Sequence, residues 1–500
     1  MWTFLKVNIT SARGTGVVNI FRDLDGTHLR GRISCGATET TGVVMTMRLG
    51  VLILAAGEGK RMRSRMPKVL HPLAGKPLLG HVLDTAQALG AARIGVIYGH
   101  GGELVPRQMA EYDCTWVEQA EQRGTGHAVM QAMPYMRDMD RILVLYGDVP
   151  LIRPTTLQRL MEAATVTELG VLTAVLEDPT GYGRIIRDES ERVVRNVEQR
   201  DATAAELRIG EVNTGFFVAD RARLDNWLAG IGSHNAQGEY YLTDVLALAV
   251  RAGVEIVTSQ PETLDEVYGV NDRVQLAGLE RSLQRRWAEV LMRGGVTLAD
   301  PARLDIRGRL QAGEDVSIDV NVIIEGDVRL AAGVSIGPNC LLRDCTIGLG
   351  TEVFANCVIE GATVGAGVHL GPFSRLRPES VLADDVHVGN FVELKKAKVG
   401  AGSKVNHLTY VGDAHIGRDV NVGAGTITCN YDGAYKHLTV IGDDAFIGSN
   451  ASLIAPVEIG TGATVGAGSV VCREVPAGKL TLTRAGQITL DHWQRPRKPG

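Results

Sequence analysis

The spacing of hydrophobic residues changes along the 500-residue chain and divides it into regions with different predicted folds. Between about 47 and 270, the apolar runs "VLILAAG" (51–57), "RIGVIYG" (93–99) and "RILVLYGD" (141–148) predict buried strands. They alternate with helical patterns such as "KPLLGHVLDTAQALG" (76–90), where apolar residues recur at helix spacing. This alternation predicts an α/β, Rossmann-like domain over 47–270, with a mostly parallel sheet covered on both faces.

One long helix is predicted next, over 271–295. Its apolar residues are three to five positions apart, and Gly294-Gly295 ends the pattern. These residues are Val274, Leu279, Leu283, Trp287 and Leu291. We interpret the helix as an arm that connects the first domain to the region after it.

From about 300 the hydrophobic period becomes six. One series runs from Leu370 through Leu376, Leu382 and Val388 to Leu394, and a second runs from Ile441 to Val471. Many of these aliphatic residues are followed by glycine. A period of six predicts a parallel β-helix over 296–480, whose coils have three flat faces, an inward aliphatic residue on each face and glycine easing the turns. A β-sandwich would instead show period-two alternation.

The second series begins after an interruption. Ile441 comes nineteen positions after Val422, which is not a multiple of six, and the stretch between them contains "GAGTITCNYDGAYKHLT". An insertion in a solenoid usually forms a loop on one face, often the binding face. We therefore expect a projecting loop here, and a short C-terminal tail over 481–500.

Composition and charge narrow the possible partners. The chain has 60 glycines in 500 residues, or 12%, against a usual share of roughly 7%, and the six-residue repeat explains much of this excess. Its net charge of −5 predicts neither nucleic acid nor a membrane as a partner. Seven cysteines without a CxxC pair favour a reducing cytosol, and no apolar run approaches the ~18 residues of a membrane span.

Residues 1–46 show no sustained helix or strand period and no secretory signal. A clear pattern starts only at Met47. We expect the physiological start at Met47 or Met45, and the N-terminal extension to be disordered or an artefact of the assigned start codon.

Two loops after predicted strands carry candidate chemistry. In "LILAAGEGKRMRSRMPKVL" (52–70), small residues followed by Lys60, Arg61 and Lys68 suit a polyphosphate. The stretch has neither the third glycine of a dinucleotide fingerprint nor a Walker A pattern, and a plain turn remains the alternative. In "YGDVPL" (146–151), Asp148 ends a strand, where it is either a turn residue or a ligand for a hard cation such as Mg²⁺.

A run of motifs closely resembles one enzyme family over about 47–495. In order they are "LAAGEGKRM…PKVL", "QAEQRGTGHA", "LYGDVPL", "DPTGYGRI", "VNTGFF", "NAQGEYYLTD" and "GVNDR". They are similar to the uridylyltransferase half of the bifunctional N-acetylglucosamine-1-phosphate uridylyltransferase/glucosamine-1-phosphate acetyltransferases. The family also has the same domain order, a nucleotidyltransferase domain followed by a left-handed β-helix.

The resemblance implies a UTP and UDP-N-acetylglucosamine site in the first domain. Arg61 and Lys68 would neutralise phosphate charge as catalytic residues, and Asp148 and Asn271 would hold Mg²⁺. The nucleotide and sugar would contact Leu54, Ala55, Ala56, Gly57, Lys68, Gln119, Gly124, Thr125, Tyr146, Gly147, Asp148, Gly183, Glu198, Asn213 and Asn271. Without the resemblance, Glu198 and Asn213 would be interpreted as solvated surface residues.

The β-helix could be only an oligomerisation rod, but it concentrates polar residues in "RLRP", "FVELKKAKVG", "NHLTYVGD" and "TCNYDG". These motifs resemble the acetyltransferase half of the family. Acetyl transfer to an amine needs a base, and histidine suits that role near pH 7. The resemblance implies His407 as the base, Arg377, Lys395, Tyr410, Asn421, Asn430 and Tyr431 as substrate residues, and Ala424, Asn430, Tyr431, Ser449, Ala467 and Arg484 on the acetyl-CoA side.

Three functions therefore stay open at the level of sequence. The first is a cytoplasmic bifunctional enzyme, with glucosamine 1-phosphate, acetyl-CoA and UTP as substrates and Mg²⁺ as cofactor. The second is a nucleotidyltransferase whose β-helix only holds a trimer together, and the third is a binding scaffold without catalysis. The set of His407, Tyr410, Asn430 and Tyr431 favours the first, because an inert rod would have no reason to carry it. Known hexapeptide solenoids are usually trimers, so a homotrimer is expected.

Overall fold

The computed structural model describes residues 5–11, 14–20, 47–57, 59–99, 102–164, 169–483 and 486–495. The chain divides into two compact units, 1–46 and 47–500. In the first unit, β1 (Leu5–Ser11) pairs antiparallel with β2 (Gly14–Ile20), where the sequence analysis expects no regular element. The short alternation in "LKVNITS" has the period of a strand. The predicted start at Met47 or Met45 stays a prediction.

The second unit begins with a nine-stranded sheet of order β11-β10-β12-β8-β3-β6-β7, in which β9 pairs with β12 and β13. The predicted parallel sheet is confirmed around β3, where β6, β7 and β8 run in the same direction, whereas β12 is antiparallel to β8. The strands are β3 (Leu49–Ala55), β6 (Arg93–Tyr98), β7 (Thr115–Glu118), β8 (Arg141–Tyr146), β9 (Leu169–Val175), β10 (Gly183–Arg187), β11 (Val193–Val197), β12 (Glu211–Asp220) and β13 (Ile256–Ser259).

Helices cover both faces of this sheet. On β3, Val51 and Ile53 point to one face and pack with α1 and α4, whereas Leu52 and Leu54 point to the other and pack with α3, α5 and α6. A strand buried on both faces needs an unbroken apolar run, which is what "VLILA" supplies. The helices are α1 (Leu78–Ala88), α2 (Leu104–Gln108), α3 (Thr125–Ala132), α4 (Pro154–Ala163), α5 (Arg221–Ala229) and α6 (Asp244–Arg251).

The predicted arm is α7 (Arg273–Arg293), which ends at Gly294. Leu279 and Leu283 are buried against the first domain, but Val274 is 82% exposed and does not belong to the packed stripe. Further along, the side-chain amide of Gln284 exchanges two hydrogen bonds with the backbone of Ile306, at 2.7 and 2.8 Å. None of the helices in the described parts of the chain is both long and apolar enough to span a membrane.

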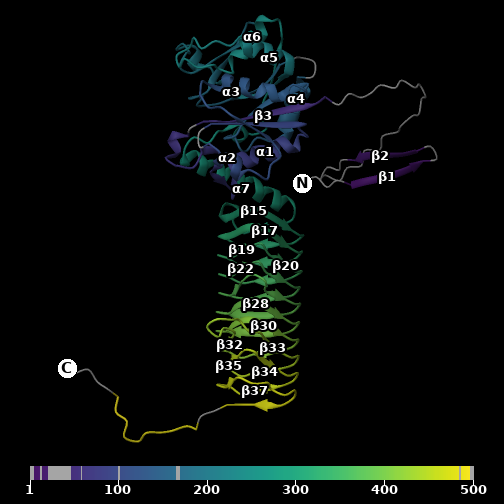
Figure 1. Cartoon of the computed structure of the whole chain (residues 1–500), viewed down its shortest axis with the longest axis vertical. Helices are drawn as coiled ribbons and strands as arrows, with labels where there is room; N and C mark the ends of the chain where they lie inside the picture. The colour runs from purple at the N-terminus through teal and green to yellow at the C-terminus, as the bar shows by residue number, and fades with distance from the viewer. Residues whose placement is uncertain are drawn as a thin grey trace. The chain divides into compact units, whose positions relative to one another are not determined.

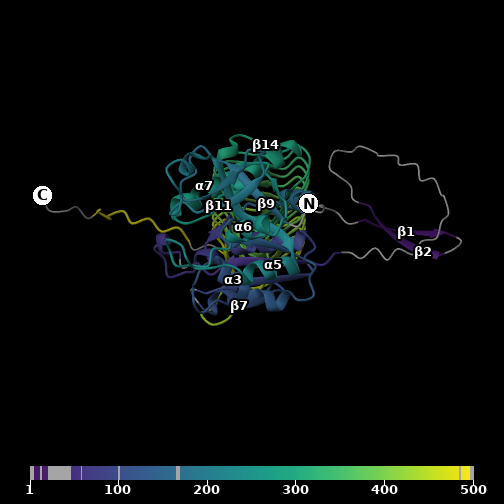
Figure 2. The same ribbon diagram turned by 90° about the horizontal axis from the view of Figure 1, so that it is seen from above.

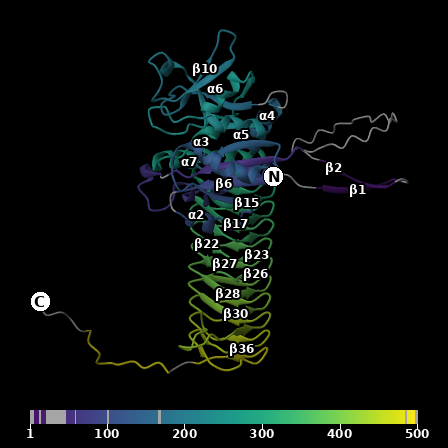
Figure 3. The ribbon, with the colours of Figure 1, turned by 45° about the horizontal axis from the view of Figure 1, so that its top comes forward.

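The β-helix runs from β14 (Thr297–Leu298) to β39 (Leu480–Thr481), and its coils stack regularly (Figures 1 and 3). Outside the inserted loop, residues that pair between neighbouring coils are 17 or 18 positions apart, as Leu370, Val388 and Val405 are, except at the first pairing of strands (20 positions) and at the last (16 positions). A regular coil therefore holds three faces of about six residues each. Every aliphatic residue of the two six-residue series is buried, as predicted. Seen from above, the coils overlie one another (Figure 2). The domain boundaries at 270, 295 and 480 stay predictions.

The glycines that follow inward aliphatic residues serve a purpose beyond the turning of the chain. At Gly348, an added side-chain carbon would lie 2.4 Å from the backbone of Gly365 in the next coil, and Gly400 and Gly448 meet the coil after them in the same way. Glycine is needed there because neighbouring coils approach too closely for a Cβ atom. The glycine excess therefore reflects coil-to-coil packing as well as turns.

Candidate active sites

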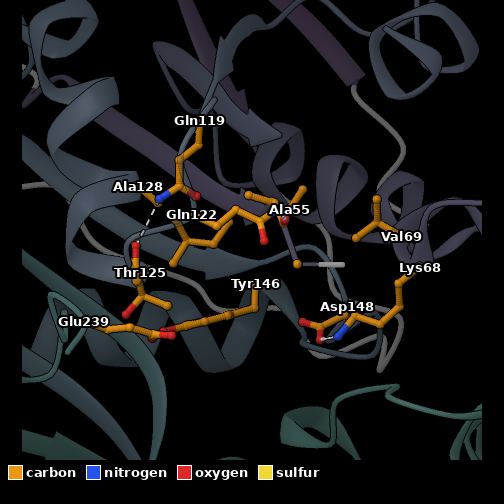
Figure 4. A pocket seen from close by; sticks show the side chains of 14 residues that line it. Ala55, Lys68, Val69, Gln119, Gln122, Thr125, Ala128, Tyr146, Asp148 and Glu239 are labelled. Carbon is orange, nitrogen blue, oxygen red and sulfur yellow. Dashed lines mark hydrogen bonds and ion pairs between the residues drawn. The ribbon is translucent and has the colours of Figure 1, made fainter. Parts of the chain in front are cut away.

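A cavity of about 280 Å³ opens at the carboxyl ends of β3 and β8 (Figure 4). The parallel strands bring the loop after β3 and the "YGD" segment together, as the strand-end argument requires. Ten of the predicted UTP-site residues line this cavity, namely Leu54, Ala55, Ala56, Gly57, Lys68, Gln119, Gly124, Thr125, Tyr146 and Asp148.

Lys68, Asp148 and Asn271 meet at one end of the cavity. The Lys68 ammonium forms an ion pair with a carboxylate oxygen of Asp148 (Figure 4). It also lies 3.3 Å from the side-chain oxygen of Asn271. Asn271 precedes α7, so the arm begins at this cluster. The side-chain oxygens of Asp148 and Asn271 thus both face the Lys68 ammonium. A carboxylate oxygen together with an amide oxygen also suits Mg²⁺ as a ligand set.

Tyr146 connects the cavity to the predicted sugar residues. Burial, followed by the nearby carboxylates of Glu198 and Asp148, raises the pKa of its hydroxyl, which therefore stays neutral. Glu198 accepts hydrogen bonds from Asn196 at 2.9 Å and Thr243 at 2.8 Å. Its partners show that Glu198 is not a solvated surface residue.

Four further predicted residues of this site are not part of the cavity lining. Gly147 donates its backbone N–H to Leu54, and Gly183 pairs with Asn213 across two strands. Asn213 is buried, and its side chain accepts a hydrogen bond from the backbone of Gly215 at 2.8 Å. Arg61 is exposed on a short 3₁₀ helix (Lys60–Met62) and does not line the cavity.

Four residues that line the cavity are absent from the predicted set: Val69, Gln122, Ala128 and Glu239. Gln122 closes the loop after β3, because its side-chain amide donates to the carbonyl of Ala56 at 2.7 Å. Gln122 and Glu239 stand inside the motifs "QAEQRGTGHA" and "NAQGEYYLTD", so the motifs marked these segments without identifying the residues.

On the β-helix, His407 belongs to a vertical column of equivalent residues, one from each coil. The column is Asn390, His407, Ala424, Ser449 and Ala467. Backbone hydrogen bonds link the column from coil to coil. Leu408, which follows His407, donates its N–H to the carbonyl of Asn390, and Gly425, which follows Ala424, donates to the carbonyl of His407. The column thus aligns the predicted base with three residues of the predicted acetyl-CoA side.

Asn390, which the sequence analysis did not select, orients His407. The His407 Nδ1 atom lies 3.1 Å from the side-chain oxygen of Asn390. Because that oxygen only accepts, His407 donates from Nδ1 and keeps a free lone pair on Nε2. β27 (His387–Asn390) and β29 (Lys404–His407) pair in register, which places the two residues opposite each other. Asn390 and His407 are 17 positions apart in the sequence, and the register between neighbouring coils brings them together.

Positive charges gather around Lys395, which lies on β28 (Glu393–Val399) where that strand pairs with β30 (Tyr410–Ile416). Lys436, from the inserted loop, lies near the Lys395 ammonium and lowers the pKa of Lys395, and Arg377 adds to the lowering. Arg377 also pairs with Glu393 at 3.0 Å. Lys436 is a residue that the sequence analysis missed, although the interruption of the six-residue period had marked its loop.

The other predicted acetyl-site residues occupy several positions around this cluster. Asn430 is buried and donates to a carboxylate oxygen of Asp413, and Tyr410 pairs with Glu393 in the neighbouring coil. Tyr431 is 60% exposed on the loop, and Asn421 lies on a different face, in β31 (Asn421–Val422). Arg484 lies outside the described residues.

Comparison with known families agrees with this division of the chain. The MobA-like NTP transferase domain matches residues 51–209, the GMPPB C-terminal domain matches 306–408, and the bacterial transferase hexapeptide (six repeats) matches 438–473. The solved structure of UDP-glucose pyrophosphorylase complexed with UDP-glucose covers 48% of this chain and all of its own, at a TM-score of 0.40 and 17% identity. A likeness this low adds nothing to the assignment.

Two curated relatives extend the match over nearly the whole chain. The bifunctional protein GlmU of Janthinobacterium sp. (strain Marseille) is 56% identical over 90% of this chain and 99% of its own length. The bifunctional protein GlmU of Burkholderia thailandensis is 57% identical over the same shares. The chain therefore belongs to the bifunctional GlmU family, the uridylyltransferase and acetyltransferase family that its motifs resemble.

Proposed function

We propose that the chain makes UDP-N-acetylglucosamine in two steps. It acetylates glucosamine 1-phosphate with acetyl-CoA, and then transfers UMP from UTP to N-acetylglucosamine 1-phosphate with release of pyrophosphate. Membership of the bifunctional family over 90% of the chain carries this conclusion, because it assigns both activities. The cavity of the first domain and the polar column of the β-helix give each activity a separate candidate site.

In the uridylyl step, a phosphate oxygen of the sugar attacks the α-phosphorus of UTP and pyrophosphate leaves. No protein nucleophile is required, so the chain contributes position and positive charge. We assign Lys68 and Arg61 to the phosphates, and Gln119, Gly124 and Thr125 to the uracil end. Tyr146, Glu198 and Asn213 are assigned to the sugar and ribose. The support is that Lys68, Gln119, Gly124, Thr125 and Tyr146 line one cavity.

We propose that Asp148 and Asn271 hold Mg²⁺. Nucleotidyltransferases of this kind need a divalent metal, which neutralises phosphate charge when bound. In the described parts of the chain, no group of three or more His, Cys, Asp or Glu side chains could hold a metal. One carboxylate and one amide oxygen fit Mg²⁺, which takes its remaining ligands from substrate phosphates and water. Lys68, which faces both oxygens, would then be free to turn toward a phosphate.

In the acetyl step, the amine of glucosamine 1-phosphate attacks the thioester carbonyl of acetyl-CoA and the thiol leaves. We assign the role of base to His407, whose Nε2 is free to take the amine proton while Asn390 holds Nδ1. Arg377, Lys395 and Lys436 are assigned to the sugar phosphate, since an anion between the neighbouring ammonium groups would relieve their repulsion. Cys429 needs no role, because the acetyl group passes directly to the amine.

The column supplies a track for the extended cofactor. Below His407 it presents only Ala424, Ser449 and Ala467, whose small side chains leave the surface open. At about 4.8 Å per coil, this track runs about 14 Å from His407, long enough for much of a pantetheine arm. Arg484 is proposed as a further contact of acetyl-CoA.

We propose a homotrimer, supported by an apolar strip of Phe373, Phe391 and Leu408 beside the column. These side chains are 49%, 55% and 63% exposed, and their backbones adopt left-handed φ angles of 56°, 56° and 49°. The described coils before and after them use Asn or Gly at the equivalent position. Bulky residues cost roughly 1–2 kcal/mol each in that conformation. A second copy of the chain that covers the strip would offset this cost and lie next to His407.

A cytoplasmic location completes the proposal. The six cysteines in the part of the chain that the structure describes are all free, which suits a reducing compartment.

Two single variants test the function. His407→Ala should lower acetyl transfer at least ~100-fold and leave uridylyl transfer within twofold. Asp148→Ala should do the reverse, with the loss confined to the Mg²⁺-dependent step. Both are measured by release of the CoA thiol and of pyrophosphate. If His407→Ala retained acetyl transfer, His407 would not be the base. If the unaltered chain lacked acetyl transfer, the β-helix would be only a scaffold.

A further inference from the structure

The inserted loop between β32 (Ile427–Cys429) and β33 (Thr439–Ile441) folds back on itself. Equivalent residues on either side of it, Ile416 and Ile441, are 25 positions apart, against 17 in the coil before, where Val399 pairs with Ile416. The loop lies outside the β-helix core, and Tyr431 and Tyr435 are 60% and 72% exposed. Tyr431 and Lys436 form an antiparallel bridge, so the loop is a small hairpin without a core of its own.

One carboxylate holds this hairpin together. Oδ1 of Asp432 accepts hydrogen bonds from the backbone of Ala434 at 2.8 Å and of Tyr435 at 2.7 Å. Its other oxygen, Oδ2, lies 2.6 Å from Nε2 of His437. The first oxygen shapes the turn, and the second ties the end of the loop to its beginning. The backbone N–H of His437 also donates to Asn430 at 2.8 Å, which anchors the same end to the β-helix.

The residue beside His437 is Lys436, whose ammonium lies near that of Lys395 and lowers its pKa. Two ammonium groups repel each other, and Lys436 is exposed, so an unrestrained loop would move its side chain into the solvent. Arg377 adds a third positive charge, while Asp413 is the nearby carboxylate that favours the charged form of Lys395. Something must hold Lys436 in place before an anion arrives, and the Asp432–His437 pair is the adjacent restraint.

We propose that the Asp432–His437 pair is a clamp that positions Lys436 for the phosphate of the acetyl acceptor. Asp432 and His437 are then positioning residues, which act through Lys436 and do not touch the reacting atoms. The inference rests on the proposed acetyltransferase site. Since the clamp acts on binding of the sugar phosphate, its loss should change KM for that substrate and leave the chemical step intact.

His437→Leu and His437→Gln form a matched pair that tests the clamp. Leucine cannot donate to Asp432, whereas the glutamine amide can replace the Nε2–H donor. His437→Leu should raise KM for glucosamine 1-phosphate about tenfold, the effect of losing one hydrogen bond to a charged group. We expect kcat and KM for acetyl-CoA to change less than twofold, and His437→Gln to restore KM to within about twofold of the unaltered chain.

A double variant shows whether the clamp acts through Lys436. Lys436→Met should raise KM for glucosamine 1-phosphate by itself, and adding His437→Leu should raise it no further. Amide hydrogen exchange at Ala434 and Tyr435 should accelerate in His437→Leu and not in His437→Gln.

Two results would overturn the clamp while leaving the function standing. One is an unchanged KM in an active His437→Leu enzyme, and the other is a fall in kcat at constant KM. Absence of acetyl transfer in the unaltered chain would instead overturn the proposed function, and this inference with it. Uridylyl transfer, measured in the same samples, reports whether each variant is folded.

Discussion

Gly215 shows how closely single residues define the nucleotide site. It lies on β12 with a φ of 88°, and an added side-chain carbon would come 2.5 Å from Cε2 of Tyr146. Both the backbone conformation and the space therefore require glycine. The position matters because Tyr146 lines the cavity and Gly215 also donates its N–H to Asn213.

Gly215→Ala should impair uridylyl transfer by displacing Tyr146. The strained φ costs about 1–3 kcal/mol of domain stability, and the displaced ring should lower kcat/KM at least ~tenfold. Acetyl transfer should be unchanged. Gly253→Ala is the matched control, because Gly253 has a similar φ of 75° but nothing within 4 Å of the added carbon. If both variants lost uridylyl transfer equally, backbone strain and not contact with Tyr146 would be the cause.

The residues that the sequence analysis found and missed differ in one respect. Ala55 and Asp148 stand inside local motifs after strands, so pattern and resemblance could identify them. Asn390 and Lys436 acquire meaning only from neighbours 17 and 41 positions away. Those neighbours depend on the number of residues in each coil and on how the inserted loop folds back, and local spacing specifies neither.

At the scale of elements, an alternating line of charges runs along one face of the β-helix. Arg307 pairs with Glu325 at 3.2 Å, Arg343 with Glu325 and with Glu360 at 3.0 Å, and Arg375 with Glu360 at 3.2 Å. We call these five residues the charge ladder. A slip by one coil would set like charges opposite each other, so the ladder favours the observed register.

Arg343→Met should lower the melting temperature by weakening the ladder, and the effect should depend on pH. Arg343 and then Arg307 hold the pKa of Glu325 below its usual value. A depressed carboxylate pKa stabilises the fold above the unfolded value of about 4.3, and that contribution is lost as the pH falls below it. The melting temperatures of the unaltered chain and of Arg343→Met should therefore differ most at pH 7, and the difference should shrink below about pH 4.

Salt provides a second check on the ladder. In ~1 M NaCl, where charges are screened within about 3 Å, the difference between the chain and Arg343→Met should also shrink. Arg329→Met is the control, because the ion pair that Arg329 makes with Asp327 lies outside the ladder. If the difference in melting temperature persisted at high salt and at low pH, packing of the aliphatic part of the Arg343 side chain would be its cause, and not charge.

At the scale of the whole chain, α7 connects the candidate nucleotide site to the start of the β-helix. Asn271, just before the helix, faces the Lys68–Asp148 pair. Gln284, midway along the helix, donates a hydrogen bond to the backbone of Ile306 in the first coils of the β-helix. The hydrophobic periods were enough to predict a domain, a helix and a solenoid in this order. They could not predict the apolar strip, because Phe373, Phe391 and Leu408 point outward and do not belong to the buried series of six.

The pair of substitutions Phe373→Asn and Phe391→Asn should dissociate the proposed trimer. Asparagine occupies the equivalent position in other coils, so these changes relieve backbone strain in each chain while they remove the apolar surface. Sedimentation equilibrium should show the mass falling toward one chain, and acetyl transfer should fall with it, since the strip borders His407. Uridylyl transfer should persist. Val470→Asn, which removes another exposed apolar side chain of the β-helix, should leave the mass unchanged. A double variant that kept its mass and both activities would show that the strip is not the subunit contact.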